Sequence, residues 1–211
     1  MKKLIRIPTG KLFTALFASL WLSFLALTAQ ASTILQVGIT DLLNESQFVF
    51  HGRVVEKWTD IDQSSNTIFT HVRMAIDDAI KGTYKQESIV LKFMGGTYGQ
   101  QTLEVFEMNV PIVGEEGIYF VERTNRVQVN PFFGWHQGHF VVRYANDGRT
   151  KLIMTHDLRP IYELQPAQHT TTMDLSTGIP LGVRTDERPG DSPLSLALFK
   201  TRLKEISEVL K

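Results

Sequence analysis

The sequence of 211 residues contains no cysteine. This absence excludes disulfide frameworks, thiol nucleophiles, thiolate-bound zinc and iron–sulfur clusters. It also excludes lipid attachment to a cysteine after the N-terminal hydrophobic run. The chain lacks a G-x-S-x-G nucleophile elbow, and no Walker-type or dinucleotide-binding glycine pattern follows a predicted strand. The core must therefore be held by packing alone, and any site chemistry must come from histidines, carboxylates or aromatic side chains.

Long hydrophobic runs are also scarce, and the one that exists lies at the N-terminus. Lys2, Lys3, Arg6 and Lys11 precede an uncharged run over residues 12–27, and Ala29-Gln30-Ala31 follows it. This pattern predicts a signal peptide over residues 1–31, cleaved before Ser32. The competing interpretation is a membrane anchor, but a spanning helix needs about 20 apolar residues. We therefore expect a periplasmic or extracellular protein with no membrane span after cleavage.

Charge and length narrow the class of protein further. The predicted signal peptide holds four of the 22 basic residues and none of the 22 acidic ones, which leaves 18 basic and 22 acidic residues. The resulting formal charge of about −4 argues against nucleic acid as a partner, because nucleic-acid binding normally needs a basic face. Residues 32–211 are enough for one domain that buries about 70% of its unfolded surface.

Alternating apolar residues predict a mainly β domain over residues 32–164. The expected strands are 48–58, 68–80, 87–94, 118–122, 126–129, 140–144 and 152–154. Gly52 marks a bulge or a close strand approach, and the broken alternation at Asp77-Asp78 predicts a bulge. Asn146-Asp147-Gly148 is a turn signal between two hairpin strands. Such short, closely spaced strands favour an antiparallel barrel or sandwich.

Two helices flank this β region in the prediction. Apolar spacing predicts a short helix over residues 34–43. Residues 165–193, rich in proline, threonine and glycine, read as a linker or surface loop. The last segment, 194–211, is predicted to be an amphipathic helix with Ser195 as its cap. Its apolar stripe, from Leu196 to Leu210, is expected to dock on the same domain.

Several short sequence motifs occur in an order known from other proteins. They are Phe48-Val49-Phe50-His51-Gly52-Arg53-Val54-Val55, then Ala79-Ile80-Lys81-Gly82, and then Val113-Gly114-Glu115-Glu116 leading into Ile118-Tyr119-Phe120. Over residues 47–144 the chain resembles uncharacterised exported bacterial proteins. It is more distantly similar to the netrin-module and tissue-inhibitor-of-metalloproteinases group. The resemblance implies an antiparallel OB-like barrel with added helices.

The resemblance also implies a partner, namely another exported protein such as a metalloprotease. In the inhibitors, a cysteine pair near the N-terminus anchors the segment that enters the protease cleft. Here the mature chain is predicted to start at Ser32-Thr33 without a cysteine. Only the free amine of Ser32 is left to approach a catalytic metal, and little would pre-organise it.

Trp135-His136-Gln137-Gly138-His139 is the candidate for metal binding. His136 and His139 are zinc- or copper-ligand types, and His156 or Asp157 is the nearest candidate for a third ligand. Histidines three residues apart point to opposite faces of a strand, so only a loop would bring them together. The simpler interpretation is structural. The acid pairs at 60/62, 77/78 and 115/116 are read as solvated surface charge.

Recognition residues are expected among aromatics outside the strands. Residues 95–99, Gly-Gly-Thr-Tyr-Gly, are read as a mobile loop that carries Tyr98. Phe106 and Trp135 are predicted partner contacts, and Phe132 with Phe133 are predicted to plug the barrel. The predicted function is a non-catalytic exported binding module that uses residues 95–110 and 130–139 and needs no cofactor. The alternatives are a metal-dependent hydrolase using His136 and His139, and a purely structural envelope protein.

Overall fold

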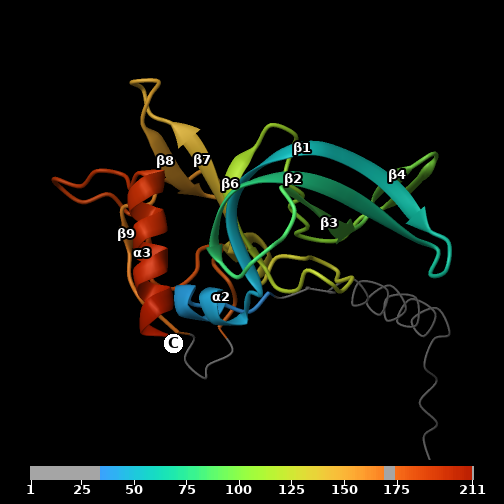
Figure 1. Ribbon diagram of the computed structural model, residues 1–211, viewed down its shortest axis with the longest axis horizontal. Helices are drawn as coiled ribbons and strands as arrows, with labels where there is room; N and C mark the ends of the chain where they lie inside the picture. Colours follow the sequence, from blue (N-terminus) through green and yellow to red (C-terminus); the bar gives the residue numbers. More distant parts are fainter. Residues whose placement is uncertain (1–33, 169–173, 211) are drawn as a thin grey trace, which may run out of the picture. The chain divides into compact units, whose positions relative to one another are not determined.

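Six antiparallel strands form the main sheet of the computed structural model, which describes residues 34–168 and 174–210 (Figure 1). Their order across the sheet is β3-β2-β1-β6-β7-β8. The strands are β1 (Phe48–Asp62), β2 (Thr67–Lys81), β3 (Ser88–Met94), β6 (Glu116–Val121), β7 (His139–Tyr144) and β8 (Lys151–Thr155). Among the described residues β3 and β8 are edge strands that do not pair with each other. The protein is mainly β, as predicted, but its sheet is not closed into a barrel.

Two short strand pairs and three helices complete the described part of the fold. They are β4 (Gly96–Tyr98) with β5 (Gln101–Leu103), β9 (Glu163–Leu164) with β10 (Val183–Arg184), and the helices α2 (Ile39–Glu45), η1 (Trp135–Gly138) and α3 (Leu196–Val209). In the part that the structure describes, no helix is long and apolar enough to cross a membrane. The predicted signal peptide and Ser32 lie outside the described residues.

The sheet separates two hydrophobic cores. The first lies on the face covered by α2 and α3 and contains Val49, Phe120 and Phe140 from the strands. The second lies on the opposite face, where Phe48 and Phe50 of β1 pack with residues of β2, β3 and β6. Successive residues of β1 enter different cores because side chains alternate across a strand. This explains why both faces of β1 are apolar in the sequence.

The C-terminal helix docks on its own domain, as predicted. The Ser195 hydroxyl accepts a hydrogen bond from the Leu198 amide at 3.2 Å and caps α3. Phe199, Leu203 and Ile206 are buried in the first core, and α3 contacts both β2 and β8. Burial stabilises each of these side chains by about 1.5–3 kcal/mol before entropy is subtracted.

The start of the described chain differs from the prediction. The helix expected over residues 34–43 begins only at Ile39, where the Gly38 amide donates to the Asp41 carboxylate at 2.8 Å. Residues 34–38 are instead extended and pair with the stretch expected to be a linker or surface loop. Leu35 bridges to Leu175, and Gly38 bridges to Leu181. Apolar spacing alone could not reveal this pairing, because its partner lies about 140 residues further along the chain.

Bulges in the β1–β2 ladder turn individual side chains out of alternation. His51 pairs with Asp78 and Gly52 with Ile76, so Asp77 has no partner across the ladder. The bulge predicted at Asp77-Asp78 is therefore confirmed. Gly52 permits the close approach that was expected, since a Cβ there would lie 2.2 Å from the Ala75 carbonyl oxygen. The expected strand over 126–129 is wrong, because these residues form no strand.

Candidate functional site

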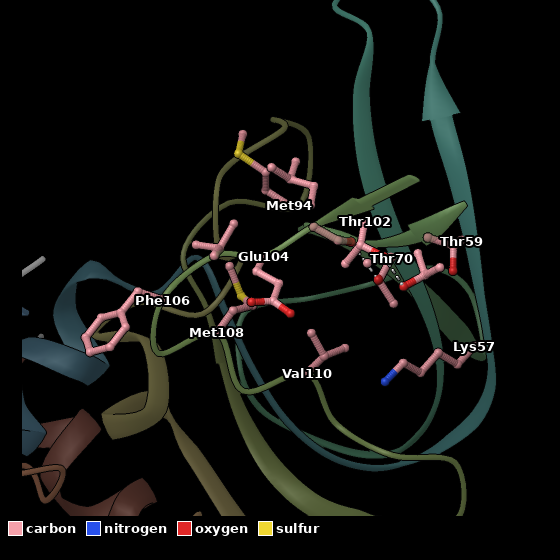
Figure 2. A pocket seen from close by; sticks show the side chains of 14 residues that line it. Lys57, Thr59, Thr70, Met94, Thr102, Glu104, Phe106, Met108 and Val110 are labelled. Carbon is pink, nitrogen blue, oxygen red and sulfur yellow. Dashed lines mark hydrogen bonds between the residues drawn. The ribbon is translucent and has the colours of Figure 1, made fainter. Parts of the chain in front are cut away.

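A groove of about 730 Å³ opens beside the β4–β5 hairpin (Figure 2). Its apolar lining includes Met94, Val105, Phe106, Met108 and Val110, and its polar lining includes Lys57, Thr59, Thr70, Thr97, Thr102 and Glu104. Figure 2 shows Phe106 at one end and Lys57 at the other, with the side chain of Lys57 extending toward Val110. The groove therefore combines an apolar wall with a few hydroxyl and charged groups.

Two consecutive glycines shape the wall of the groove. Gly95 and Gly96 have φ angles of 103° and 128°, which L-residues rarely adopt. A Cβ on Gly96 would lie 2.5 Å from the Thr70 hydroxyl oxygen, and that hydroxyl donates to the Gly95 carbonyl at 2.7 Å. The expectation of a mobile loop over 95–99 is wrong, because residues 96–98 and 101–103 pair as an antiparallel hairpin.

The predicted recognition residues do not all gather at this groove. Phe106 lines it and is 66% exposed, whereas Tyr98 is 45% exposed on β4 and is not among the lining residues. Trp135 is half-buried at the start of η1, with a left-handed φ of 57°, and it is not a lining residue either. Phe132 lies in the second core and Phe133 packs against the first, so they contact different faces of an open sheet and do not plug a barrel.

A buried ion-pair network surrounds Glu116 at the start of β6. Only 5% of Glu116 is exposed. One carboxylate oxygen accepts hydrogen bonds from Lys151 at 2.7 Å and from His51 at 2.8 Å, and the other accepts from Arg53 at 2.8 Å. The bulge brings Asp77 to 3.9 Å from the second nitrogen of His51. The expectation that Glu116 is solvated surface charge is therefore wrong.

The charges of this network balance without a metal ion. His51, Asp77 and Glu116 form the single set of three metal-ligand residue types whose ligand atoms lie within 4.8 Å of one another in the described chain. Burial raises the pKa of Glu116, but hydrogen bonds from Lys151 and His51 outweigh it, and the pKa lies below its usual value. Arg53 and Lys151 both bond to the Glu116 carboxylate, and Asp77 lies 3.9 Å from His51. A divalent ion would have to displace these cations, so we interpret the network as structural.

The structure gives His136 and His139 different neighbours. His139 is buried, and its Nε2 lies 2.7 Å from a carboxylate oxygen of Glu115 while its ring stacks on Tyr119. The ring of His136 instead lies 4.8 Å from the ring of His156, centre to centre. Among the described residues, these histidines belong to no set of three ligands within 4.8 Å of one another.

Two buried glutamines position the loop that carries His136. The Gln137 side-chain oxygen accepts from the Gln36 side chain and from the Val37 amide, both at 3.0 Å. Gln36 also donates to the Ile179 carbonyl at 2.6 Å and accepts from the Thr177 amide at 3.0 Å. Three segments that are distant in sequence, around residues 36, 137 and 178, are thereby tied together. No residue pattern in the sequence signalled this contact.

The fold and these sites define a mainly β protein with a groove at one end of its sheet and a buried polar centre between its segments. Comparison of the chain with protein-family models, curated proteins and solved structures finds no match. Its function must therefore be argued from its own side chains.

Proposed function

We propose that this chain is a non-catalytic, exported module that binds an extended segment of another envelope or secreted protein in the groove beside the β4–β5 hairpin. The observation that carries the proposal is Phe106, a large aromatic side chain that is 66% exposed on the wall of the groove. Large aromatic side chains in a concave apolar setting are typical anchors of protein interfaces.

The lining of the groove suits a peptide better than a small charged metabolite. Methionine and valine side chains supply apolar contact area, and the threonine hydroxyls can donate to or accept from a peptide backbone. Lys57 and Glu104 add one charge of each sign. A segment with apolar side chains and few charges would match this surface.

The kind of partner that we propose is inferred from the sequence resemblance. A protease, and a metalloprotease in particular, is the partner that similarity to the netrin-module and inhibitor group suggests. An OB-type relationship belongs to the same proposal; the antiparallel sheet with a helix-covered face supports it, whereas the open strand order does not. Approach of a Ser32 amine to a catalytic metal belongs to the same proposal, as does export to the periplasm or beyond. The rival functions are a metal-dependent hydrolase and a purely structural envelope protein.

Photo-crosslinking at single positions tests the proposal. A photoreactive phenylalanine analogue replaces Phe106 in one variant and Leu198, which is 43% exposed on α3, in a matched control. We expect the Phe106 variant to capture one protein that the Leu198 variant does not. With that protein purified, Phe106→Ala should weaken its affinity at least about tenfold, and Leu198→Ala should not.

Three results would contradict the binding module. Capture of the same proteins by the Phe106 and Leu198 variants would show that the groove does not bind a specific partner. Recovery of no partner under several growth conditions would favour the structural protein. Hydrolysis of a captured partner by the purified chain would favour the hydrolase.

A further inference from the structure

His136 and His156 form a pair of imidazoles that the groove does not use. His136 lies in η1, and His156 follows β8 directly. Their ring centres are 4.8 Å apart, with an angle of 38° between the ring planes. Both residues are half-buried, and the Nδ1 atom of His156 is buried with no hydrogen-bond partner in the described structure. A buried ring nitrogen without a partner costs free energy unless a ligand completes it.

The separation of the two rings matches shared coordination. Imidazole nitrogens bind zinc at about 2.0–2.1 Å, and tetrahedral ligands are about 110° apart, which puts two ring centres about 5 Å from each other. The observed 4.8 Å agrees with this distance.

The segment opposite the rings leaves room beside them. The Ser176 hydroxyl lies 3.4 Å from the Nε2 of His136. Gly178 has no side chain, and a Cβ there would lie 3.6 Å from His156 and 3.9 Å from the Nε2 of His136. The glutamine contacts between Gln36 and Gln137 hold this segment and the His136 loop together. The site is thus built from three fixed segments.

We propose that His136 and His156 bind one divalent transition-metal ion of the zinc and copper type. Water would complete its coordination, and two imidazoles favour zinc and copper over magnesium or calcium. This site differs from the sequence-based pair of His136 and His139, because Glu115 already occupies the Nε2 of His139. The proposal does not rest on the binding function of the groove.

Titration calorimetry of the full chain without an affinity tag tests the site. We expect one equivalent of Zn²⁺ or Cu²⁺ to bind saturably, and Mg²⁺ and Ca²⁺ not to bind. His136→Gln and His156→Asn should each weaken binding at least about tenfold. His71→Asn is the matched control, because His71 is also half-buried and stacked on an aromatic ring, that of Trp58, away from the pair. It should leave the affinity unchanged.

A spectroscopic measurement on the wild-type chain keeps the test independent of how the variants fold. Electron paramagnetic resonance of the Cu²⁺ complex should show coupling to two imidazole nitrogens, and His156→Asn should reduce it to one. Zinc should raise the thermal midpoint of the wild type and not that of His156→Asn. Absence of saturable binding, a copper spectrum without imidazole nitrogens, or equal loss in His71→Asn would overturn the proposal.

Discussion

The Gln137 side chain allows a direct test of how the extended N-terminal segment is held. Gln137 is fully buried, and its oxygen accepts from Gln36 and from the Val37 amide, while its nitrogen donates to the Leu35 carbonyl at 2.9 Å. Gln137→Leu keeps most of the side-chain shape and removes every hydrogen bond. The variant therefore isolates the polar contribution of this contact.

The expected loss of stability depends on which hydrogen-bond partners of Gln137 can bond to another group in the variant. Gln36 keeps its bond to Ile179, and Leu35 is half exposed, so its carbonyl can bind water. The Val37 amide is left without its partner. An unpaired polar group in a buried setting costs about 1–3 kcal/mol. With the weaker losses added, we expect the free energy of unfolding to fall by about 2–3 kcal/mol.

Urea unfolding measures the global effect, and hydrogen exchange measures the local one. We expect the Val37 amide to exchange faster in Gln137→Leu, with little change in the amides of β1. Gln63→Leu is the control, because Gln63 is exposed in the β1–β2 turn, and it should change stability by less than about 0.5 kcal/mol. Unchanged exchange at Val37 would refute the assigned hydrogen bonds.

Two further predictions concern the sheet. Burial raises the pKa of Asp78, but the hydrogen bond and charge of Lys200 outweigh it, so the folded pKa lies below the unfolded value. The pair therefore stabilises the fold above the unfolded pKa and is lost as pH falls through the folded one. Asp78→Asn should lower the free energy of unfolding, measured in urea, by up to about 1 kcal/mol at pH 7. The difference in stability between wild type and variant should vanish in acid, and a difference that does not change with pH would contradict the ion pair. Gly96→Ala forces a Cβ against Thr70 and should lower the free energy of unfolding by about 3 kcal/mol or more, measured by thermal unfolding. The control Gly99→Ala meets no atom within 4 Å and should lower it by only about 1 kcal/mol. Equal losses would argue against the close approach of the hairpin to Thr70.

Local patterns in the sequence were sufficient for most of the regular elements. The alternation of Phe48, Phe50 and Val54 predicted β1, and the spacing of Phe199, Leu203 and Ile206 predicted α3 and its docking. These patterns work because one face of each element must be buried, and burial imposes the period of the element on the sequence. Even the bulge at Asp77 was readable as a break in that period.

Contacts between distant segments were not predictable in the same way. Glu115 and Glu116 look like a solvated pair after a turn, yet Glu116 is buried because Arg53 and Lys151 converge on it from two other strands. The glycines at 95 and 96 signal a turn, but only the nearby Thr70 shows that they permit close packing of a hairpin. Burial of a polar group depends on its partners, and a single local pattern does not contain them.

The contact between His136 and His156 could be predicted from strand register, although it could not be predicted from local spacing. The turn at Asn146-Asp147-Gly148 sets the β7–β8 register, in which Phe140 pairs with Thr155. Extrapolated by one position, this register would place His139 opposite His156; in the structure the ring of His136, in η1, lies 4.8 Å from the ring of His156. Extending a predicted hairpin beyond its apolar strands would therefore have brought His156 to this loop. Because His136 and His139 are close in sequence, the sequence pattern favoured them as a metal-binding pair. The hairpin instead brings together His136 and His156, which are twenty positions apart.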